Sequence, residues 1–424
     1  MTDLKPQLFR CLQGYSKDRF LKDLTAGVIV AIIALPLSIA LALASGVSPE
    51  QGLYTAIVAG FLISALGGSK VQIAGPTGVM LVLMGILHMG SMIKFIPYTI
   101  TIGFTAGIAV TIVIGQLKDF FGLTFQQAPV ETMEKLEEVV RTFHTVNPAA
   151  MAVGILSLSI LLLWPRVSKR IPASLIAVLL TAAVVGLLDL PVNTIGDLYV
   201  ISSALPAFQM PDLSYETVSA VLPDAFTIAV LAAIESLLSA VVADEMIGSR
   251  HNSNMELVAQ GVGNSASALF GGIPATGAIA RTAANIKNGG TSPVAGMVHA
   301  LVLLLVLVLL MPYAALIPMP CIAAILFQVA YNMSGWRTVL KVAKTSPKSD
   351  IAVLVLTFIL TVAFDLVVAI GVGLSLACLL FMKRMADVAV GKEWEYVEDT
   401  GDEQGRLKPV PAYVMVYEIS GPMF

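Results

Sequence analysis

The chain has 424 residues, of which 57% are hydrophobic and only 12% are charged, and its formal net charge at pH 7 is −3. A soluble domain normally carries about 25% charged residues, so this composition, with a mean hydropathy of +0.86, excludes an ordinary soluble protein. The nearly balanced charge gives no signal for nucleic-acid binding, and the three cysteines and four histidines lack the spacing of metal ligands.

Apolar runs recur along the chain, and a helix needs roughly 17–25 such residues to cross the hydrocarbon core of a bilayer. The clearest runs are residues 24–49, 149–165, 297–311, 351–364 and 366–382. We therefore predict an all-α polytopic membrane protein. The first run is too long for the hydrophobic part of a signal peptide and no A-x-A site follows it, so we do not expect it to be cleaved.

The distribution of Lys and Arg predicts the orientation in the membrane. Basic residues concentrate in four groups: 1–23, 166–170, 337–348 and 383–384. In contrast, residues 189–224 contain no Lys or Arg. The positive-inside rule therefore places both termini in the cytoplasm and 189–224 outside a plasma or inner membrane. Within 118–148, four glutamates indicate an amphipathic helix at the outer surface.

The two halves of the chain repeat each other weakly. From the start of an apolar helix to a Thr-Gly pair there are 54 residues in the first half (Leu24 to Gly78) and 52 in the second (Ala225 to Gly277). The basic groups give these two helices opposite orientations. An inverted repeat with short, Gly- and Pro-interrupted segments at matching positions is the best sequence indication of a transporter binding site.

Glycine and proline around both Thr-Gly pairs cannot continue an ordinary helix. We expect the segment beyond each pair to begin in mid-membrane as a half-helix, with its unpaired amides and positive dipole end facing inward. Two such ends that meet at the midplane form an anion site. The residues expected to line it are Gly75, Pro76, Thr77, Thr276, Gly277 and Ala278. Arg281 either adds positive field behind this site or is a surface cation that reaches the cytoplasm.

Glu235 lies in the middle of an apolar stretch bounded by Asp224 and Asp244. An unpaired carboxylate there costs roughly 2.5–3.5 kcal/mol even on the lenient insertion scale. Such a group is tolerated mainly where it holds a proton, a cation or a substrate. Ser239 follows one turn later on the same helix face, so the pair is suited either to Na⁺ coordination or to protonation. The alternative is a carboxylate that is satisfied by a neighbouring hydroxyl or Arg and only packs.

Several motifs resemble the SulP (sulfate permease) family of anion transporters, over about residues 15–390. The motifs are Gln72-Ile-Ala-Gly-Pro-Thr77, the run 96–107 ending in 116–122, Ile234-Glu-Ser-Leu-Leu238, 250–257 and 275–285. The resemblance implies a seven-plus-seven inverted repeat, with a core and a gate that move against each other and an acidic coupling residue at the position of Glu235. It also implies a cytoplasmic STAS domain, whose linker and first strand we place in 386–424.

The resemblance has a gap near residues 78–93, where the family carries a half-helix and a full helix. Only 18 residues, Pro76 to Ile93, precede Lys94 here, enough for one span. We expect that about one helix is missing from the chain; the alternative is a thirteen-span protein. The expected domains are a cytoplasmic segment (1–23) and a transport domain (24–385) with repeats at about 24–189 and 225–385, followed by the linker.

These features predict a secondary active transporter for a small anion, and the resemblance implies that it works by an elevator-like shift of the core against the gate. Sulfate, bicarbonate and C4-dicarboxylates are the candidate substrates, and a proton or sodium gradient supplies the energy because no phosphate-binding loop occurs. An uncoupled anion channel and a nucleobase permease on the same architecture are the alternatives. We expect a homodimer, no organic cofactor and no enzymatic activity, because no nucleophile, metal cluster or carboxylate pair is visible.

Overall fold

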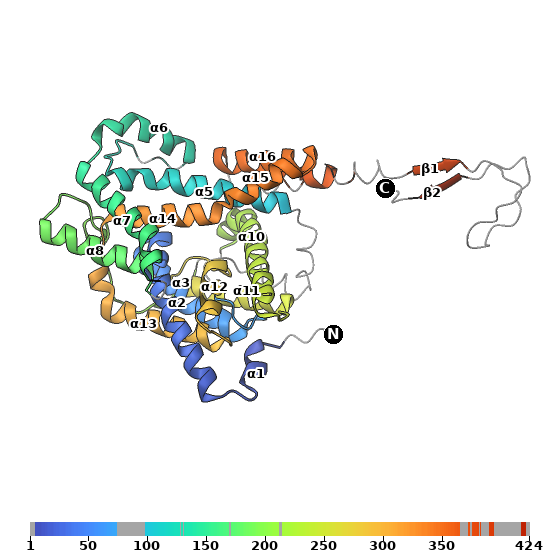
Figure 1. Cartoon of the computed structure of the whole chain (residues 1–424), viewed down its shortest axis with the longest axis horizontal. Coiled ribbons are helices and arrows are strands. Elements are labelled where there is room, and N and C mark those ends of the chain that lie inside the picture. The colour runs from blue at the N-terminus through green and yellow to red at the C-terminus, as the bar shows by residue number, and fades with distance from the viewer. Residues whose placement is uncertain are drawn as a thin grey trace, which may run out of the picture.

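In the computed structural model the chain is built mainly from α-helices (Figure 1), so the prediction of an all-α membrane fold is confirmed. The structure describes residues 5–73, 98–127, 129, 131–168, 171–211, 214–364, 372–373, 375–380, 382, 390–393 and 417–420. The first half contains α1 (Gln7–Leu12), α2 (Lys17–Ala44), α3 (Pro49–Leu66), α5 (Tyr98–Phe121), α6 (Thr132–Thr142), the short η2 (Phe143–Thr145), α7 (Pro148–Val167), α8 (Ala173–Leu188) and α9 (Ile195–Leu198). The second half contains α10 (Tyr215–Ile247), α11 (Ser253–Leu269), α12 (Ile279–Lys287), α13 (Val294–Ala314), α14 (Met319–Ser334), α15 (Trp336–Thr345) and α16 (Lys348–Ala363).

The first long helix begins earlier than its apolar run predicts. α2 begins at Lys17 rather than at Leu24, because Ser16 caps it: the Ser16 hydroxyl accepts a hydrogen bond from the backbone N–H of Arg19 at 3.3 Å. We expect the charged first turns to lie outside the hydrocarbon, because ionised side chains are costly within it. The apolar run then corresponds to the part of the helix that crosses the membrane.

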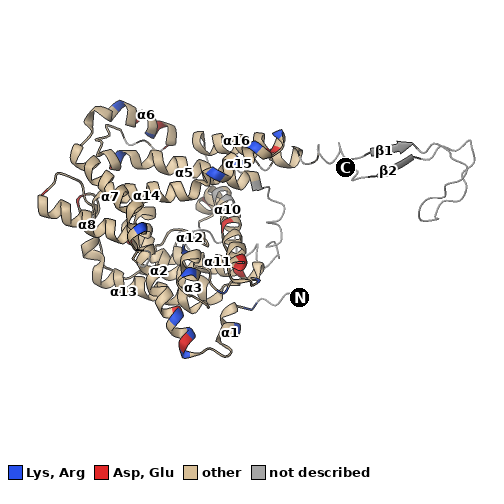
Figure 2. Cartoon of the chain, in the orientation of Figure 1, with Lys and Arg blue, Asp and Glu red and all other residues tan. Residues whose placement is uncertain are grey.

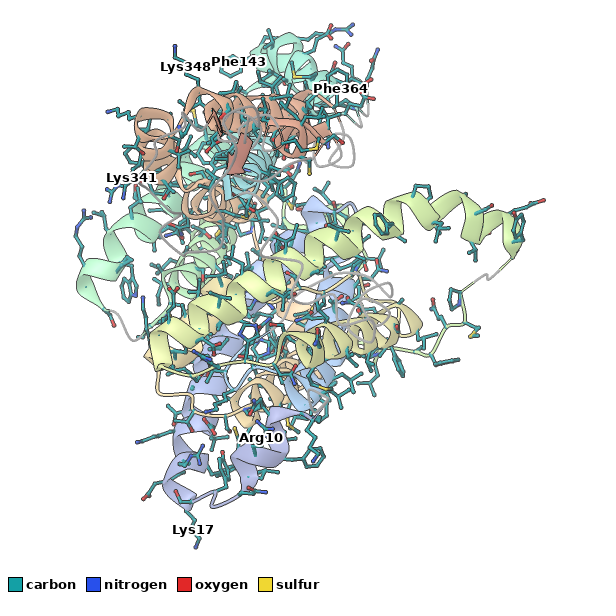
Figure 3. The ribbon with its side chains drawn as sticks, turned by 90° about the vertical axis from the view of Figure 1, so that its right-hand side faces the viewer. Arg10, Lys17, Phe143, Lys341, Lys348 and Phe364 are labelled. Atoms are coloured by element: carbon teal, nitrogen blue, oxygen red, sulfur yellow. The ribbon has the colours of Figure 1, made fainter. Side chains whose placement is uncertain are left out.

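The longest helix, α10, also begins before its apolar run, at Tyr215 rather than at Ala225. Ser214 caps its N-terminus through its side chain. The helix bends by 53° between Tyr215–Pro223 and Ile228–Ile247, and its first part projects from the body of the molecule (Figure 3). The bend coincides with a proline, which removes one helical hydrogen bond.

Among the described residues, four helices are long and apolar enough to cross a membrane, namely α2, α5, α7 and α13. The bent α10 makes a fifth if its two parts count as one span. α12 is far shorter, with nine residues. This agrees with the half-helix expected after Gly277; the first expected half-helix, after Thr77, and the region 78–93 lie outside the described residues.

The helices form two groups in space (Figure 1). In what we call the core group, α13 packs against α2 and α3, α11 packs against α3, and α12 lies against α2 and α10. In the gate group, α5 packs against α14 and α16, and α7 packs against α14 and α8. The two groups meet along α2, which contacts α14, α8 and α5.

Close packing within and between the groups depends on leucines and on small residues. Leu53 of α3, Leu303 of α13 and Leu326 of α14 are fully buried in one hydrophobic cluster. In the gate group, a β-carbon on Gly103 of α5 would lie 2.5 Å from the carbonyl oxygen of Leu354 in α16. Glycine therefore allows the two backbones to approach closely, as is common between membrane helices.

Charged residues gather at the ends of helices. Figure 2 shows Lys and Arg around the start of α2 and over α15. The helix predicted within 118–148 is present as α6, and its Glu138 accepts a hydrogen bond from the backbone N–H of Gln126 at 2.8 Å. Near the C-terminus, β1 (Val390–Glu393) pairs antiparallel with β2 (Tyr417–Ser420), which lies in the stretch where a strand is predicted.

Candidate functional site at the crossing of two extended segments

Two extended stretches from opposite halves of the sequence lie side by side in the core group. Residues 71–73 follow α3, and residues 273–278 lead from α11 into α12. The backbone N–H of Ala278 donates to the carbonyl of Ile73 at 3.1 Å. Asn285 of α12 donates through its side chain to the carbonyl of Val71 at 2.9 Å. We call this pairing of the two stretches the crossing.

Side chains satisfy the irregular backbone of the second stretch. The hydroxyl of Thr55 accepts from the N–H of Ile273 at 2.7 Å, and Ser267 donates to the Ile273 carbonyl at 2.9 Å. Asn264 pairs with both backbone groups of Ala275: its Oδ1 accepts from the N–H and its Nδ2 donates to the carbonyl at 2.9 Å. Non-helical backbone at membrane depth is tolerated only when buried in protein or lining a cavity, and these contacts meet that condition.

Gly277 lies at the closest point of the crossing. Its N–H donates to the hydroxyl of Ser236 at 3.0 Å, and Gln72 donates through Nε2 to the Ser236 carbonyl at 3.2 Å. A β-carbon on Gly277 would lie 1.8 Å from that same Nε2, so any other residue here would displace the Gln72 amide. Gln72 is 4% exposed, and its Oε1 has no partner among the described residues.

The predicted coupling residues face the crossing. The side chain of Glu235 lies close enough to that of Thr276 to interact with it. Ser239, one turn along α10, is fully buried and donates to the hydroxyl of Thr282 at 3.3 Å. Thr282 in turn accepts from the backbone N–H of Ile73 at 3.3 Å. A carboxylate and several hydroxyls thus lie along one side of the crossing, a donor set that suits a proton or a hard cation.

The N-terminus of α12 opens at the crossing. Ala278 is its N-cap, with an extended backbone and no side-chain hydrogen bond to the helix. The side chain of the N-cap residue therefore leaves the first amides of α12 uncapped, and the positive end of the helix dipole lies beside Thr276 and Gly277. Backbone amides at a helix N-terminus are suited to bind an anion.

Arg281 lies in the first turn of α12 and is buried, with 3% of its surface exposed. Its Nη2 donates to the hydroxyl of Ser38 in α2 at 3.1 Å. This position disagrees with a side chain that reaches the cytoplasmic surface. It agrees with a guanidinium that adds positive charge behind the helix terminus and ties α12 to α2.

The structure brings together six of the nine residues singled out from the sequence: Glu235, Ser239, Thr276, Gly277, Ala278 and Arg281. Gly75, Pro76 and Thr77 lie outside the described residues. Within the described part of the chain, no group of three or more His, Cys, Asp or Glu could hold a metal ion.

Sequence reasoning missed three residues that shape the site: Gln72, Ser236 and Asn264. Gln72 is the first residue of the motif Gln72–Thr77, and Ser236 follows Glu235 within the motif Ile234–Leu238. A polar side chain within such a motif in an apolar stretch could have indicated both residues. Nothing in the sequence around Asn264 indicates its role, because its hydrogen bonds to the backbone of Ala275 become apparent only in the folded structure.

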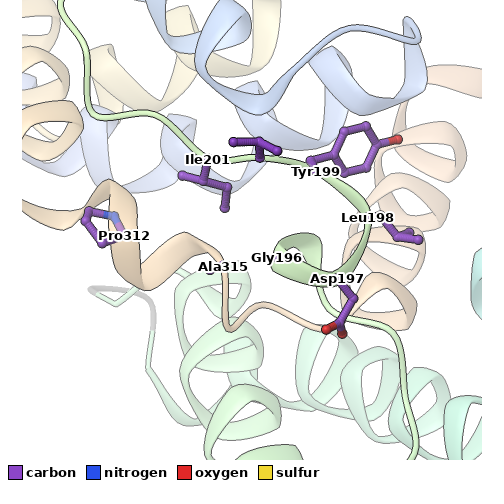
Figure 4. A pocket seen from close by; sticks show the side chains of 8 residues that line it. Gly196, Asp197, Leu198, Tyr199, Ile201, Pro312 and Ala315 are labelled. Atoms are coloured by element: carbon purple, nitrogen blue, oxygen red, sulfur yellow. The ribbon is translucent and has the colours of Figure 1, made fainter.

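A separate hollow of about 440 Å³ lies where residues 196–201 meet the end of α13 (Figure 4). One of its lining residues is Asp197, whose carboxylate accepts hydrogen bonds from the backbone N–H and the hydroxyl of Thr194, both at 2.8 Å. These bonds hold the pKa of Asp197 below its usual value. An ionised carboxylate repels anions, so this hollow is not suited to bind one.

Comparison with known proteins agrees with this geometry. The sequence profile of the Sulfate permease family matches residues 20–81 and 76–357. The two matched stretches overlap next to the region where a helix is expected to be missing.

Relatives with assigned roles include YvdB of Bacillus subtilis, described as a candidate sulfate transporter. It is 42% identical over 441 residues, covering 97% of this chain and 82% of YvdB. The bicarbonate transporter BicA of Picosynechococcus is 31% identical over 449 residues, covering 95% of this chain and 78% of BicA.

The solved transmembrane domain of a cyanobacterial BicA superposes with a TM-score of 0.75 at 31% identity, covering 84% of this chain and 99% of that domain. The relatives are membrane transporters and not enzymes. The chain is therefore a multi-pass membrane protein that belongs to the sulfate permease family of anion transporters.

Proposed function

We propose that the protein is a secondary active transporter that binds a small oxyanion at the crossing and couples its movement to a proton or sodium ion at Glu235. The observation that carries this proposal is that the side chains of Glu235 and Thr276 lie close enough to interact. Thr276 lies in the stretch that leads directly into the N-terminus of α12. Thr276 therefore links the ionisable side chain of Glu235 to the backbone amides that would bind the anion.

The anion half of the proposal rests on the uncapped N-terminus of α12 and on buried Arg281. Both supply positive potential in a region of low dielectric, where it is screened less than in water. The N-terminus of α12 would bind the anion through its backbone N–H groups, so no charged side chain needs to contact the anion. We infer that Gly75, Pro76 and Thr77 complete the site from the other half of the repeat.

The coupling half rests on the position of Glu235. A carboxylate beside an anion site repels the anion when it is ionised and unpaired. A bound proton or Na⁺ removes that repulsion, so anion and cation bind with positive cooperativity, and each raises the affinity for the other by the same factor. This reciprocity makes uptake of the anion follow the cation gradient.

Movement is proposed to follow the division into two groups of helices. All residues of the crossing and Glu235 belong to the core group, whereas α5, α7, α8, α14 and α16 form the gate group. A shift of the core group along the α2 contacts carries the site as a unit, which is an elevator-like mechanism.

Sulfate and bicarbonate are the first substrates to test, because YvdB and BicA are named for them. We also propose that the protein lies in the plasma or inner membrane with both termini in the cytoplasm, as the basic residues around α2 and α15 favour (Figure 2). The expected homodimer stays a prediction that cross-linking in membranes can test.

The test is uptake by proteoliposomes that contain the purified protein. Labelled sulfate, bicarbonate and succinate are each offered with an inward proton gradient, an inward sodium gradient or no gradient, and protein-free liposomes are the control. We expect one anion to accumulate above its outside concentration only when one of the two gradients is present. Absence of accumulation for all three anions, or ionic currents far above carrier turnover without any coupling, would contradict the proposal.

A further inference from the structure

A second basic feature lies at the opposite end of α12 from the crossing. A cavity of about 710 Å³ is bounded on one side by Lys22, Thr25 and Ile29 of α2, and on the other by Lys287 and the loop that follows it. Lys287 is the last residue of α12, so the length of this helix, about 14 Å for nine residues, separates the cavity from the anion site.

The charge of this cavity is positive. Lys22 and Lys287 are both exposed, neither makes an ion pair with a described residue, and no acidic residue is among the described residues that line the cavity. The neighbouring Asp23 is fully buried. Its carboxylate accepts hydrogen bonds from Tyr15 and from the loop residues Thr291 and Ser292, and these bonds hold the loop against the start of α2.

One exposed face of α12 extends from the crossing to the cavity. Ile279, Ala283 and Lys287 follow one another at four-residue spacing, so they share a face of the helix, and all three are at least partly exposed. The opposite face, with Arg281 and Asn285, is buried in the core group. This face runs from the N-terminus of α12 to Lys287, and we infer that it lines a route between the anion site and the cavity.

From this arrangement we propose that Lys22 and Lys287 form an anion-recruiting site at the cytoplasmic mouth of the transport path, which holds the transported oxyanion before it reaches the crossing or after it leaves. The inference rests on the proposed function. Two lysines from different elements facing one cavity raise the local concentration of small anions without binding them tightly. An anionic lipid headgroup has the same charge chemistry, and the experiment separates the two sources.

The experiment measures KM and the maximal rate from each face, with labelled sulfate or bicarbonate, whichever the wild type carries. Inside-out vesicles report on the cytoplasmic face and right-side-out vesicles on the outer face. Lys22→Gln and Lys287→Gln should each raise KM about fivefold on the cytoplasmic face, the effect of one charge at about 4 Å in water. The outer KM and the maximal rate should not change, and added inert salt should reduce the difference between variant and wild type.

Lys17→Gln is the matched control, because Lys17 lies on the same helix and is exposed but is not among the residues that line the cavity. An unchanged cytoplasmic KM in the double variant Lys22→Gln/Lys287→Gln would overturn the inference. A KM difference that vanishes in liposomes made only of phosphatidylcholine would also overturn it, because the lysines would then act through anionic lipid. A wild type that transports no anion would instead overturn the proposed function.

Discussion

Replacing Gly277 with alanine tests the geometry of the crossing. The added β-carbon would lie 1.8 Å from Nε2 and 2.8 Å from Cδ of Gln72, and 3.1 Å from Cα of Ser236. The first two distances are impossible for non-bonded atoms, so the Gln72 amide must move. It then loses its hydrogen bond to the Ser236 carbonyl, now 3.2 Å long.

The expected cost follows from two effects. A lost hydrogen bond between neutral groups contributes about 1 kcal/mol, and overpacking of one methyl group in a tight core costs about 1–3 kcal/mol. The displaced backbone should also move the amides that bind the anion. A loss of about 2 kcal/mol in anion binding corresponds to a roughly thirtyfold higher KM. The maximal rate at saturating anion should change less.

The assay is KM for uptake in proteoliposomes, together with the melting temperature of the protein in detergent. Gly186→Ala is the matched control, because Gly186 of α8 has no atom within 4 Å of a built β-carbon, and it should behave as the wild type. Adding Gln72→Ala to Gly277→Ala removes the clash and should restore part of the lost melting temperature. A Gly277→Ala protein with wild-type KM and melting temperature would refute this description of the crossing.

Two further predictions concern residues outside the proposed anion contact. Asn264→Leu leaves both backbone groups of Ala275 without their partner and should destabilise the protein by about 2–4 kcal/mol. The melting temperature should therefore fall strongly. Ser265→Ala on the same helix is the control, and an equal fall in both variants would contradict the role of Asn264. Burial and the hydrogen bond to Asp23 raise the pKa of Tyr15 to about 12, so the stability that it contributes should persist to about pH 10 and disappear as the pH rises through about 12. The ultraviolet difference spectrum between wild type and Tyr15→Phe should show this ionisation near pH 12, and an ionisation near pH 10 would speak against a buried contact.

The sequence contains enough information to predict the type of fold and to single out residues of the candidate site, six of which the structure brings together. Three of the five apolar runs correspond to candidate spanning helices, α2, α7 and α13, whereas run 351–364 forms the shorter α16 and run 366–382 lies partly outside the described residues. Thr276-Gly277 marks the break before a half-helix because glycine and its neighbouring proline cannot continue one. Glu235 stands out for the cost of a carboxylate in an apolar stretch. Each of these signals depends only on residues that are close in the sequence, so a single sequence is enough to recognise it.

Contacts between distant segments could not be predicted. The pairing of Gln72 with Ser236 joins residues 164 positions apart, and nothing in either neighbourhood specifies the other. The direction of Arg281 was also open, because a long cation at that position can reach either the surface or the core. Only the packing of α12 against α2 brings it to Ser38.

The central claim is that Glu235 couples a cation gradient to the anion at the crossing, and Glu235→Gln tests it most directly. Glutamine keeps the size of the side chain and its capacity for hydrogen bonds but cannot be ionised. Gradient-driven uptake and anion exchange without a gradient are measured in the same proteoliposomes, and elution from a sizing column in detergent confirms that the variant is folded. We predict that uptake against the anion gradient is lost while exchange remains; wild-type accumulation with unchanged pH and sodium dependence would contradict the account.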